Sequence, residues 1–185
     1  MSETRSLLDG ILKGAVDASG GVPGVVAMTT DSIFAIFSTT KAMTGVALMQ
    51  LVEEGQVSLD DEAGKYVPEI DAIEVLDGFS AAGEPILRKA KNKITVGHLL
   101  LHTAGFGYEF FSHGDLKYRT AKGTPSLITN TFAGIRSVRL FEAGEKWNYG
   151  TNIDWVGLVV EKLRGKRLGE VLKERLFDPL GMNDT

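Results

Sequence analysis

The stretch Ile33-Phe-Ala-Ile-Phe-Ser38-Thr-Thr-Lys41-Ala-Met-Thr-Gly45 carries the strongest chemical signal in this sequence, because it places a lysine three residues after a serine. From Ser38 to about residue 54 the apolar side chains recur at helical spacing, and Gly55 ends the pattern in the manner of a C-cap. Residues i and i+3 lie on one face of a helix, so this spacing predicts that Lys41 reaches the Ser38 hydroxyl.

A serine needs such a neighbour, because its hydroxyl holds its proton too tightly to be a good nucleophile at neutral pH. The start of a helix adds unpaired N–H groups and a positive dipole end, which suit developing negative charge. We expect Phe37, Met43, Val46 and Ala47 to bury this turn, and burial would lower the pKa of Lys41 and make it a better base. On its own the motif is a weak signal, because a serine at a helix start is most often an N-cap.

Outside this stretch the pattern is mainly helical, with turns and a few short strands. Helices are predicted over 4–18, before Pro68, from Thr95 to residue 101, over 125–134, over 152–163 with Gly165 closing it, and over 168–177 up to Pro179. Strands are predicted over 22–28 and on both sides of Ser80-Ala-Ala-Gly83, and residues 106–123 are expected to form a loop with helical turns.

The composition is that of an ordinary protein with a hydrophobic core: 185 residues, 43% hydrophobic and 24% charged. A formal charge of −4 argues against a nucleic-acid partner. No apolar run approaches the roughly 20 residues needed to cross a bilayer, and the N-terminus lacks the apolar core of a secretory signal, so a cytoplasmic location is expected. The absence of cysteine excludes disulfides, thiolate catalysis and Cys-based metal sites.

Five segments, in order, resemble the serine β-lactamase and penicillin-binding-protein superfamily, and are most similar to the class C β-lactamase-like esterases called family VIII carboxylesterases. The Ser38 stretch resembles the nucleophile segment of that family, and residues 48–61 resemble the helix and turn that follow it. Residues 94–105 resemble the "LLxHTSGL" segment, residues 147–157 the "YSxxxDxLG" segment, and residues 177–185 the "PLGMxDT" segment.

The resemblance implies that Tyr149 is the third catalytic residue, exchanging protons with Ser38 and Lys41. A tyrosine beside an ammonium group ionises more readily than usual, which agrees with this role. The β-lactamases have a Tyr-x-Asn motif, whereas position 151 is threonine here and Asn152 comes one residue later. This shift weakens the case for β-lactam turnover and fits the esterase branch better.

Other polar and aromatic residues are interpreted as structural. His98 and His102 are four residues apart but have no acidic partner at a supporting spacing, so we expect packing or hydrogen bonding, and neither a metal nor a cofactor. Asp60 and Asp61 are expected to form a turn, and Asp154 to order the start of its helix. The aromatic group Phe106, Tyr108, Phe110 and Phe111 either walls an acyl or alcohol pocket or belongs to the local core.

Relative to the family, two segments are absent. The strand over 22–28 joins directly to residues 29–34 without the hairpin found in relatives, and the sequence ends at Thr185, before the strands that carry a third motif. Whether these segments are deleted or only missing from this 185-residue stretch stays open. We expect residues 1–185 to form a single partial β-lactamase-like domain, mainly α with a small residual β component, that is, the helical portion and nucleophile helix of that α/β fold. Apolar surface left by the absent sheet would favour a homo-oligomer.

Taken together, these observations predict a serine hydrolase that cleaves short-chain carboxylic esters through an acyl-enzyme on Ser38, with Lys41 and Tyr149 moving the proton. The partner is therefore a small-molecule ester or β-lactam substrate. A β-lactamase or penicillin-binding peptidase is the first alternative. A catalytically inactive scaffold is the second, because a motif does not prove an assembled cleft.

Overall fold

The computed structural model describes residues 6, 9–11, 13–14 and 34–185, and the chain divides into two compact units, residues 1–37 and 38–185. In the first unit, residues 6, 9–11 and 13–14 are helical, in agreement with the helix predicted over 4–18, whose other residues lie outside the described ones. The strand predicted over 22–28 also lies outside them. Within the part of the chain that the structure describes, every helix is too short or too polar to cross a bilayer.

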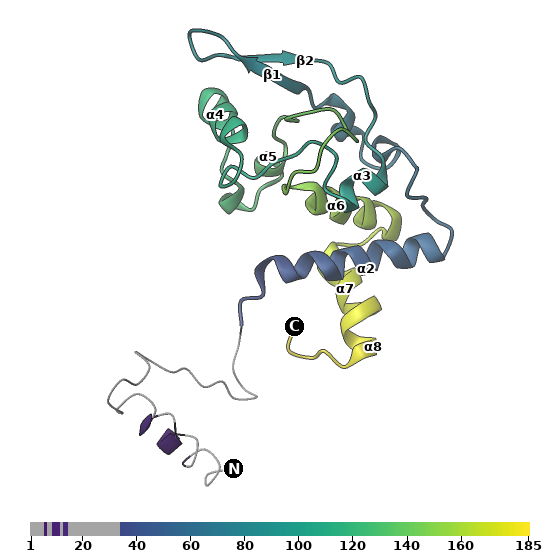
Figure 1. Ribbon diagram of the computed structural model, residues 1–185. Helices are drawn as coiled ribbons and strands as arrows, with labels where there is room; N and C mark the ends of the chain where they lie inside the picture. The colour runs from purple at the N-terminus through teal and green to yellow at the C-terminus, as the bar shows by residue number, and fades with distance from the viewer. Residues whose placement is uncertain (1–5, 7–8, 12, 15–33) are drawn as a thin grey trace. The chain divides into compact units, whose positions relative to one another are not determined.

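The second unit is built around two long helices, α2 (Thr40–Glu53) and α6 (Asn152–Arg164), which pack against each other (Figure 1). Leu48 and Leu51 of α2 and Val156 and Val159 of α6 are completely buried between them. Full burial of such a side chain contributes about 1.5–3 kcal/mol. The apolar periodicity that predicted both helices therefore marks the face that each one buries.

A glycine lets α6 pack closely against the side chain of Leu168. A Cβ added at Gly157 would lie 3.0 Å from Leu168 Cδ2 and 4.0 Å from Thr44 Cγ2. A larger side chain at position 157 would therefore displace Leu168, which belongs to α7 (Leu168–Leu172), the helix that packs against both long helices.

The described residues contain one small sheet, an antiparallel hairpin of β1 (Val75–Phe79) and β2 (Pro85–Arg88) (Figure 1). Ser80 and Gly83 close its turn, where the Gly83 N–H donates to the Ser80 carbonyl at 2.9 Å. The two strands predicted around Ser80 are thus confirmed. A mainly helical chain with a small β component, as expected, is what the described residues form.

Shorter helices complete the unit, and they correct three sequence-based expectations. Thr95 caps α3 as predicted, but residues 106–123 contain a regular helix instead of a loop, and the helix predicted over 125–134 is two short pieces. The last helix does not stop at Pro179: a π-helical turn precedes it, and Pro179 lies in the first turn of a further helix, where its missing N–H is tolerated. The remaining elements are η1 (Phe37–Thr39), η2 (Ala63–Lys65), η3 (Pro68–Ala72), α3 (Val96–Leu100), α4 (His113–Lys122), η4 (Leu127–Thr129), α5 (Phe132–Ile135), η5 (Lys173–Phe177) and α8 (Asp178–Leu180).

Helix α4 escaped prediction because the side chains that it buries are charged. Asp115 and Arg119, one turn apart, are almost fully buried and form an ion pair at 2.8 Å. Ser137 also donates to Asp115, and Arg119 donates to the carbonyls of Pro125 and Gly134. Hydrophobic periodicity cannot reveal a helix that packs through an ion pair.

Candidate active site

Ser38 and Lys41 meet as their spacing predicts. Ser38 lies in the 3₁₀ turn η1, directly before α2, and Lys41 is the second residue of α2. Lys41 Nζ donates a hydrogen bond to Ser38 Oγ at 3.1 Å. The expected burial of this turn is confirmed only in part: Ala47 is buried and Met43 half-buried, but Val46 is exposed. Ser38 is exposed, and Phe37 is 82% exposed. Among the described residues, Ser38 is therefore accessible to a reactant.

Tyr149 approaches the same lysine from the loop before α6. The centre of its ring lies 5.1 Å from Lys41 Nζ. The neighbouring Asn148 fixes the loop: its backbone N–H donates to the His102 carbonyl at 2.9 Å and its side chain to the Phe106 carbonyl at 3.0 Å. The structure therefore brings together all three residues that the sequence singled out, Ser38, Lys41 and Tyr149.

The electrostatics of this cluster correct the expected state of Lys41. Burial alone would lower the pKa of Lys41, but hydrogen bonding to Tyr108 and Tyr149 outweighs it, and the pKa is raised above 10.5. Burial raises the pKa of Tyr149, but hydrogen bonding from Ser38 and Lys41 outweighs it, and this pKa is lowered below 10.0. Lys41 is therefore an ammonium at neutral pH, and Tyr149 is the group whose acidity is enhanced.

Tyr108 is a second tyrosine at this lysine, and its position was not expected from the sequence. The centre of its ring lies 5.4 Å from Lys41 Nζ and 5.1 Å from the Tyr149 ring. Burial, followed by the negative charge of Asp154, raises the pKa of Tyr108. In the sequence it was only one member of an aromatic group, which gave no signal that separates it from Phe110 or Phe111.

Behind Tyr149 lies His102, in the left-handed backbone region at φ 57°. The Asn152 side-chain amide is 3.0 Å from His102 Nδ1, and the His102 ring centre is 4.9 Å from that of Tyr149. Burial and the positive charge of Lys41 lower the pKa of His102. The ring is therefore neutral, with Nδ1 assigned as the acceptor of the Asn152 amide proton. Asn152, which the sequence compared with the β-lactamase asparagine, points to His102 and is completely buried.

The other histidine of the pair, His98, caps its own helix. Its Nδ1 accepts from the Thr95 N–H and its N–H donates to Thr95 Oγ1, both at 3.1 Å. The hydrogen-bonding role expected for His98 and His102 is thus confirmed. Among the residues that the structure describes, no group of three or more candidate ligands surrounds a metal position.

Aromatic side chains surround Tyr149 on its exposed side. Phe111 and Trp147 are 74% and 66% exposed, and their rings lie 6.4 Å from Tyr149 and 6.3 Å from His102, respectively. Phe106 does not belong to this group, because it is buried and stacks on Trp155 at 5.8 Å. The aromatic segment therefore divides into one core residue and a partly exposed rim beside the site.

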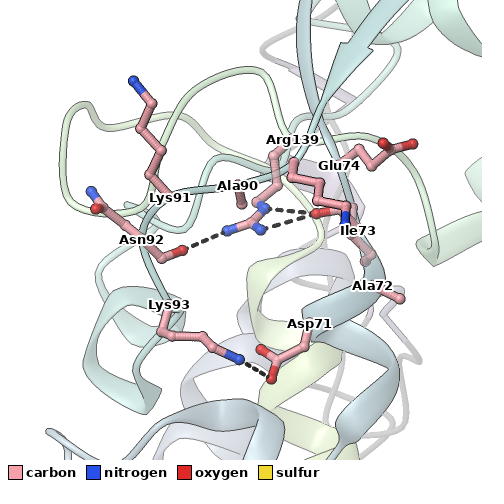
Figure 2. Close-up of a pocket in the computed structure, with 10 residues that line it drawn as sticks. Asp71, Ala72, Ile73, Glu74, Ala90, Lys91, Asn92, Lys93 and Arg139 are labelled. Atoms are coloured by element: carbon pink, nitrogen blue, oxygen red, sulfur yellow. Dashed lines mark hydrogen bonds and ion pairs between the residues drawn. The ribbon is translucent and has the colours of Figure 1, made fainter.

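A separate pocket of about 410 Å³ lies beside β1 and contains no nucleophile candidate (Figure 2). The buried Arg139 guanidinium donates to the Ile73 carbonyl at 2.9 and 3.2 Å and to the Asn92 carbonyl at 3.2 Å (Figure 2). Lys93 pairs with Asp71 across the pocket. The charged side chains of this pocket bind backbone carbonyls or each other, so we interpret the pocket as structural.

The fold and the Ser38–Lys41 pair are those of a β-lactamase-like protein, and comparison with known families agrees. A model of the Beta-lactamase family matches residues 13–185. The chain therefore belongs to the Beta-lactamase family, as the resemblance at Ser38 predicted.

Individual relatives make the comparison more specific. The chain is 40% identical over 161 residues to acyltransferase mokF of Monascus pilosus, covering 85% of this chain and 38% of the relative. It is 35% identical over 160 residues to the lovastatin esterase of Penicillium rubens, covering 84% and 39%. The structure of unliganded simvastatin synthase (LovD) from Aspergillus terreus superposes with a TM-score of 0.75 at 33% identity, covering 85% of this chain and 40% of that one. The chain thus spans about two fifths of the length of these relatives.

Proposed function

We propose that this chain supplies the nucleophile, lysine and tyrosine of a serine acyl-transfer enzyme that cleaves short-chain carboxylic esters through an acyl-Ser38 intermediate. One observation carries the proposal: Lys41 Nζ donates to Ser38 Oγ at 3.1 Å while Tyr149 lies against the same ammonium. An N-cap serine needs no such lysine, and α2 has no side-chain cap bond at its start. The similarity to acyltransferases and an esterase supports the same class of chemistry.

In the proposed reaction Tyr149 is the proton carrier and Lys41 stays an ammonium. The Tyr149 phenolate takes the Ser38 proton as Oγ bonds to the ester carbonyl carbon. The tetrahedral intermediate collapses, and the Tyr149 phenol returns the proton to the leaving alkoxide. In the second half, water gives a proton to the Tyr149 phenolate as its oxygen bonds to the acyl carbon. The acyl–Oγ bond then breaks, the Tyr149 phenol returns that proton to Ser38 Oγ, and the carboxylic acid leaves. The backbone N–H of Ser38 supplies one donor to the oxyanion.

The directions of the two pKa shifts support this division of roles. A lowered pKa makes the Tyr149 phenolate available nearer to neutral pH. A raised pKa keeps the positive charge on Lys41, where it stabilises both the phenolate and the developing oxyanion. This assignment differs from the sequence-based expectation that burial makes Lys41 a base.

An alcohol in place of water as the acyl acceptor is the second candidate function. Its specific support is the exposed aromatic rim of Phe111 and Trp147 beside Tyr149, which offers an apolar surface to an acceptor. Relatives named as acyltransferases point in the same direction. β-Lactam turnover has less support, because the buried Asn152 side chain pairs with His102.

The test is hydrolysis of p-nitrophenyl butyrate by the 185-residue chain, with and without 3-phenyl-1-propanol. We expect nitrophenol release that falls by at least about 100-fold in Ser38→Ala and in Tyr149→Phe, the loss typical of a missing acid–base group. A butyl ester of the added alcohol among the products indicates acyl transfer, and butyric acid alone indicates hydrolysis. Equal release by all three proteins would refute the proposal and leave the inactive scaffold.

A further inference from the structure

The Lys41 ammonium has two tyrosine neighbours, although the proposed reaction uses only one. Nζ lies 5.1 Å from the Tyr149 ring centre and 5.4 Å from that of Tyr108, and the rings meet edge to face at 5.1 Å. Nζ lies over the face of each ring, within the distance of a cation–π contact. The two rings and Ser38 therefore surround one cation.

Tyr108 is presented to the lysine by a backbone that has little freedom. Its carbonyl accepts from the N–H groups of Phe111 and Ser112 at 3.0 and 2.8 Å, which closes a tight turn before α4. Ser112 is in turn held by the Asn148 side chain at 3.2 Å, on the loop that carries Tyr149. A Cβ added at Gly107 would lie 2.6 Å from Ser112 Oγ, so this turn is also closely packed. The two tyrosines are thus fixed relative to each other through Asn148.

The charged and titratable groups around Lys41 come from four parts of the chain. Ser38 comes from η1, Tyr108 from the turn before α4, and His102 from the end of α3. Tyr149 comes from the loop before α6 and Asp154 from the first turn of α6. Burial raises the pKa of Asp154, and the positive charge of Lys41 opposes that rise. His102 is neutral, and Asp154 is the carboxyl group among these residues that acts on the tyrosines and on Lys41.

We propose that Tyr108 is a positioning residue that holds the Lys41 ammonium against Ser38, so that Tyr149 is free to exchange protons with the serine. This inference rests on the proposed function only for its consequence in catalysis. The contact between Tyr108 and Lys41 itself rests on the 5.4 Å between Lys41 Nζ and the Tyr108 ring centre.

The pKa values of Tyr108 and Tyr149 shift in opposite directions, which agrees with different roles for the two phenols. The pKa of Tyr108 is raised, first by burial and then by Asp154, so Tyr108 remains a neutral phenol when Tyr149 ionises. A neutral phenol oxygen accepts from an ammonium without neutralising its charge. Tyr108 can therefore orient Lys41 through the whole reaction.

The first experiment measures Lys41 directly and does not need turnover. The side-chain amine of Lys41 is titrated by NMR in the ¹⁵N-lysine-labelled chain, and its signal is assigned by its loss in Lys41→Met. In Tyr108→Phe we expect the pKa of Lys41 to fall, because a group that raises it is removed. Tyr118→Phe is the matched control, since Tyr118 is a half-buried tyrosine of α4 outside this cluster, and it should leave the titration unchanged. An unchanged Lys41 titration in a folded Tyr108→Phe would overturn the inference.

The second experiment measures the rate of Ser38 labelling by a fluorophosphonate as a function of pH. In Tyr108→Phe we expect a maximal rate about tenfold lower, the effect of one lost hydrogen bond of roughly 1.4 kcal/mol, with the rise of the rate with pH retained. Tyr149→Phe should lose that rise, whereas a structural effect alone would leave Tyr108→Phe and Tyr118→Phe alike. Loss of the rise in Tyr108→Phe would identify it as the base and overturn the inference. If the wild type is not labelled at Ser38 but the pKa of Lys41 falls in Tyr108→Phe, the proposed function is refuted while the role of Tyr108 in holding Lys41 is supported.

Discussion

At the scale of single residues, the site depends on how one ammonium group is shared by three side chains. Lys41 Nζ donates to Ser38 Oγ and lies over the rings of Tyr108 and Tyr149, and its pKa is raised while that of Tyr149 is lowered. Each group contributes to the pKa shift of the other, because each stabilises the charged form of the other. Between the two pKa values the site therefore holds an ammonium and a phenolate together.

This pairing predicts a pH dependence. The rate of Ser38 acylation should rise as pH increases through the lowered pKa of Tyr149, and should fall only where Lys41 loses its proton. In Tyr149→Phe we expect the rise to disappear and the rate to drop roughly 10²- to 10⁴-fold. Burst kinetics with p-nitrophenyl butyrate from pH 6 to 10 measures both. A rise of the same shape in Tyr149→Phe would exclude Tyr149 as the proton carrier.

His102 supports Tyr149 from behind, and its removal should destabilise the fold. In His102→Ala the Asn152 amide loses its partner in a buried position, which costs about 1–3 kcal/mol. An alanine also adopts the left-handed conformation of residue 102 only with strain. Urea unfolding should show this loss, with labelling of Ser38 also slower than in the wild type.

His113→Ala is the control, because His113 is exposed at the start of α4. It should change the free energy of unfolding by no more than about 0.5 kcal/mol, as is usual for a surface substitution. Equal stability of His102→Ala and His113→Ala would show that the His102–Asn152 contact contributes nothing.

At the scale of elements, the contact between α2 and α6 holds the nucleophile helix in place. Gly157→Val should reduce the free energy of unfolding by about 1–3 kcal/mol, because its side chain overlaps Leu168 and approaches Thr44. Gly169→Ala in α7 is the matched control: a Cβ there meets nothing within 4 Å, and alanine should stabilise the helix by roughly 0.5–1 kcal/mol. Thermal or urea unfolding of both variants checks the pair, and a Gly157→Val protein as stable as the wild type would contradict this packing.

Glu142 connects the hairpin to the loop that leads towards the site. Its buried carboxylate accepts from Arg88 of β2 and from the N–H groups of Lys91 and Asn92 at 3.0 and 3.1 Å. Burial alone would raise the pKa of Glu142, but these hydrogen bonds outweigh it and lower the pKa from 4.5 to about 2.

A folded-state pKa below the unfolded one stabilises the fold above the unfolded value. The stability due to Glu142, on the order of 3 kcal/mol, should be present above pH 4.5 and be lost as the pH falls towards about 2. Glu142→Gln should be less stable at pH 7 and show a flatter dependence over that range, whereas the exposed Glu69→Gln should behave as the wild type. Urea midpoints between pH 2 and 7 measure this, and parallel curves for Glu142→Gln and the wild type would refute the assignment.

Sequence patterns predicted the elements that bury apolar faces and missed those that do not. Helices α2 and α6 followed from the spacing of residues such as Leu51 and Val159, and the hairpin followed from the turn at Ser80. Helix α4 was missed because it packs through Asp115 and Arg119. The turn α8 was missed because Pro179 was interpreted as a stop, whereas proline is tolerated in the first turn of a helix. Local periodicity reports burial of apolar side chains and carries no information on buried ion pairs.

At the scale of the whole molecule, the candidate site is assembled from distant parts of one unit. Ser38 and Lys41 are separated from Tyr149 by more than a hundred residues, yet all three belong to residues 38–185. The Ser38–Lys41 contact was predictable because i,i+3 geometry is local, and Tyr149 followed from a family resemblance. The contacts of Tyr108 and of Asn152 were not predictable, because they arise where two loops meet in space.

The chain matches about two fifths of its relatives, so the central question is whether these residues form a reactive serine in this chain. The direct measurement is intact-mass spectrometry of the 185-residue chain after incubation with a fluorophosphonate, followed by peptide mapping. We expect a single adduct on Ser38, abolished in Ser38→Ala and formed at least about 100-fold more slowly in Tyr149→Phe. A wild-type chain that gains no adduct, or gains it equally in Ser38→Ala, would contradict an activated Ser38.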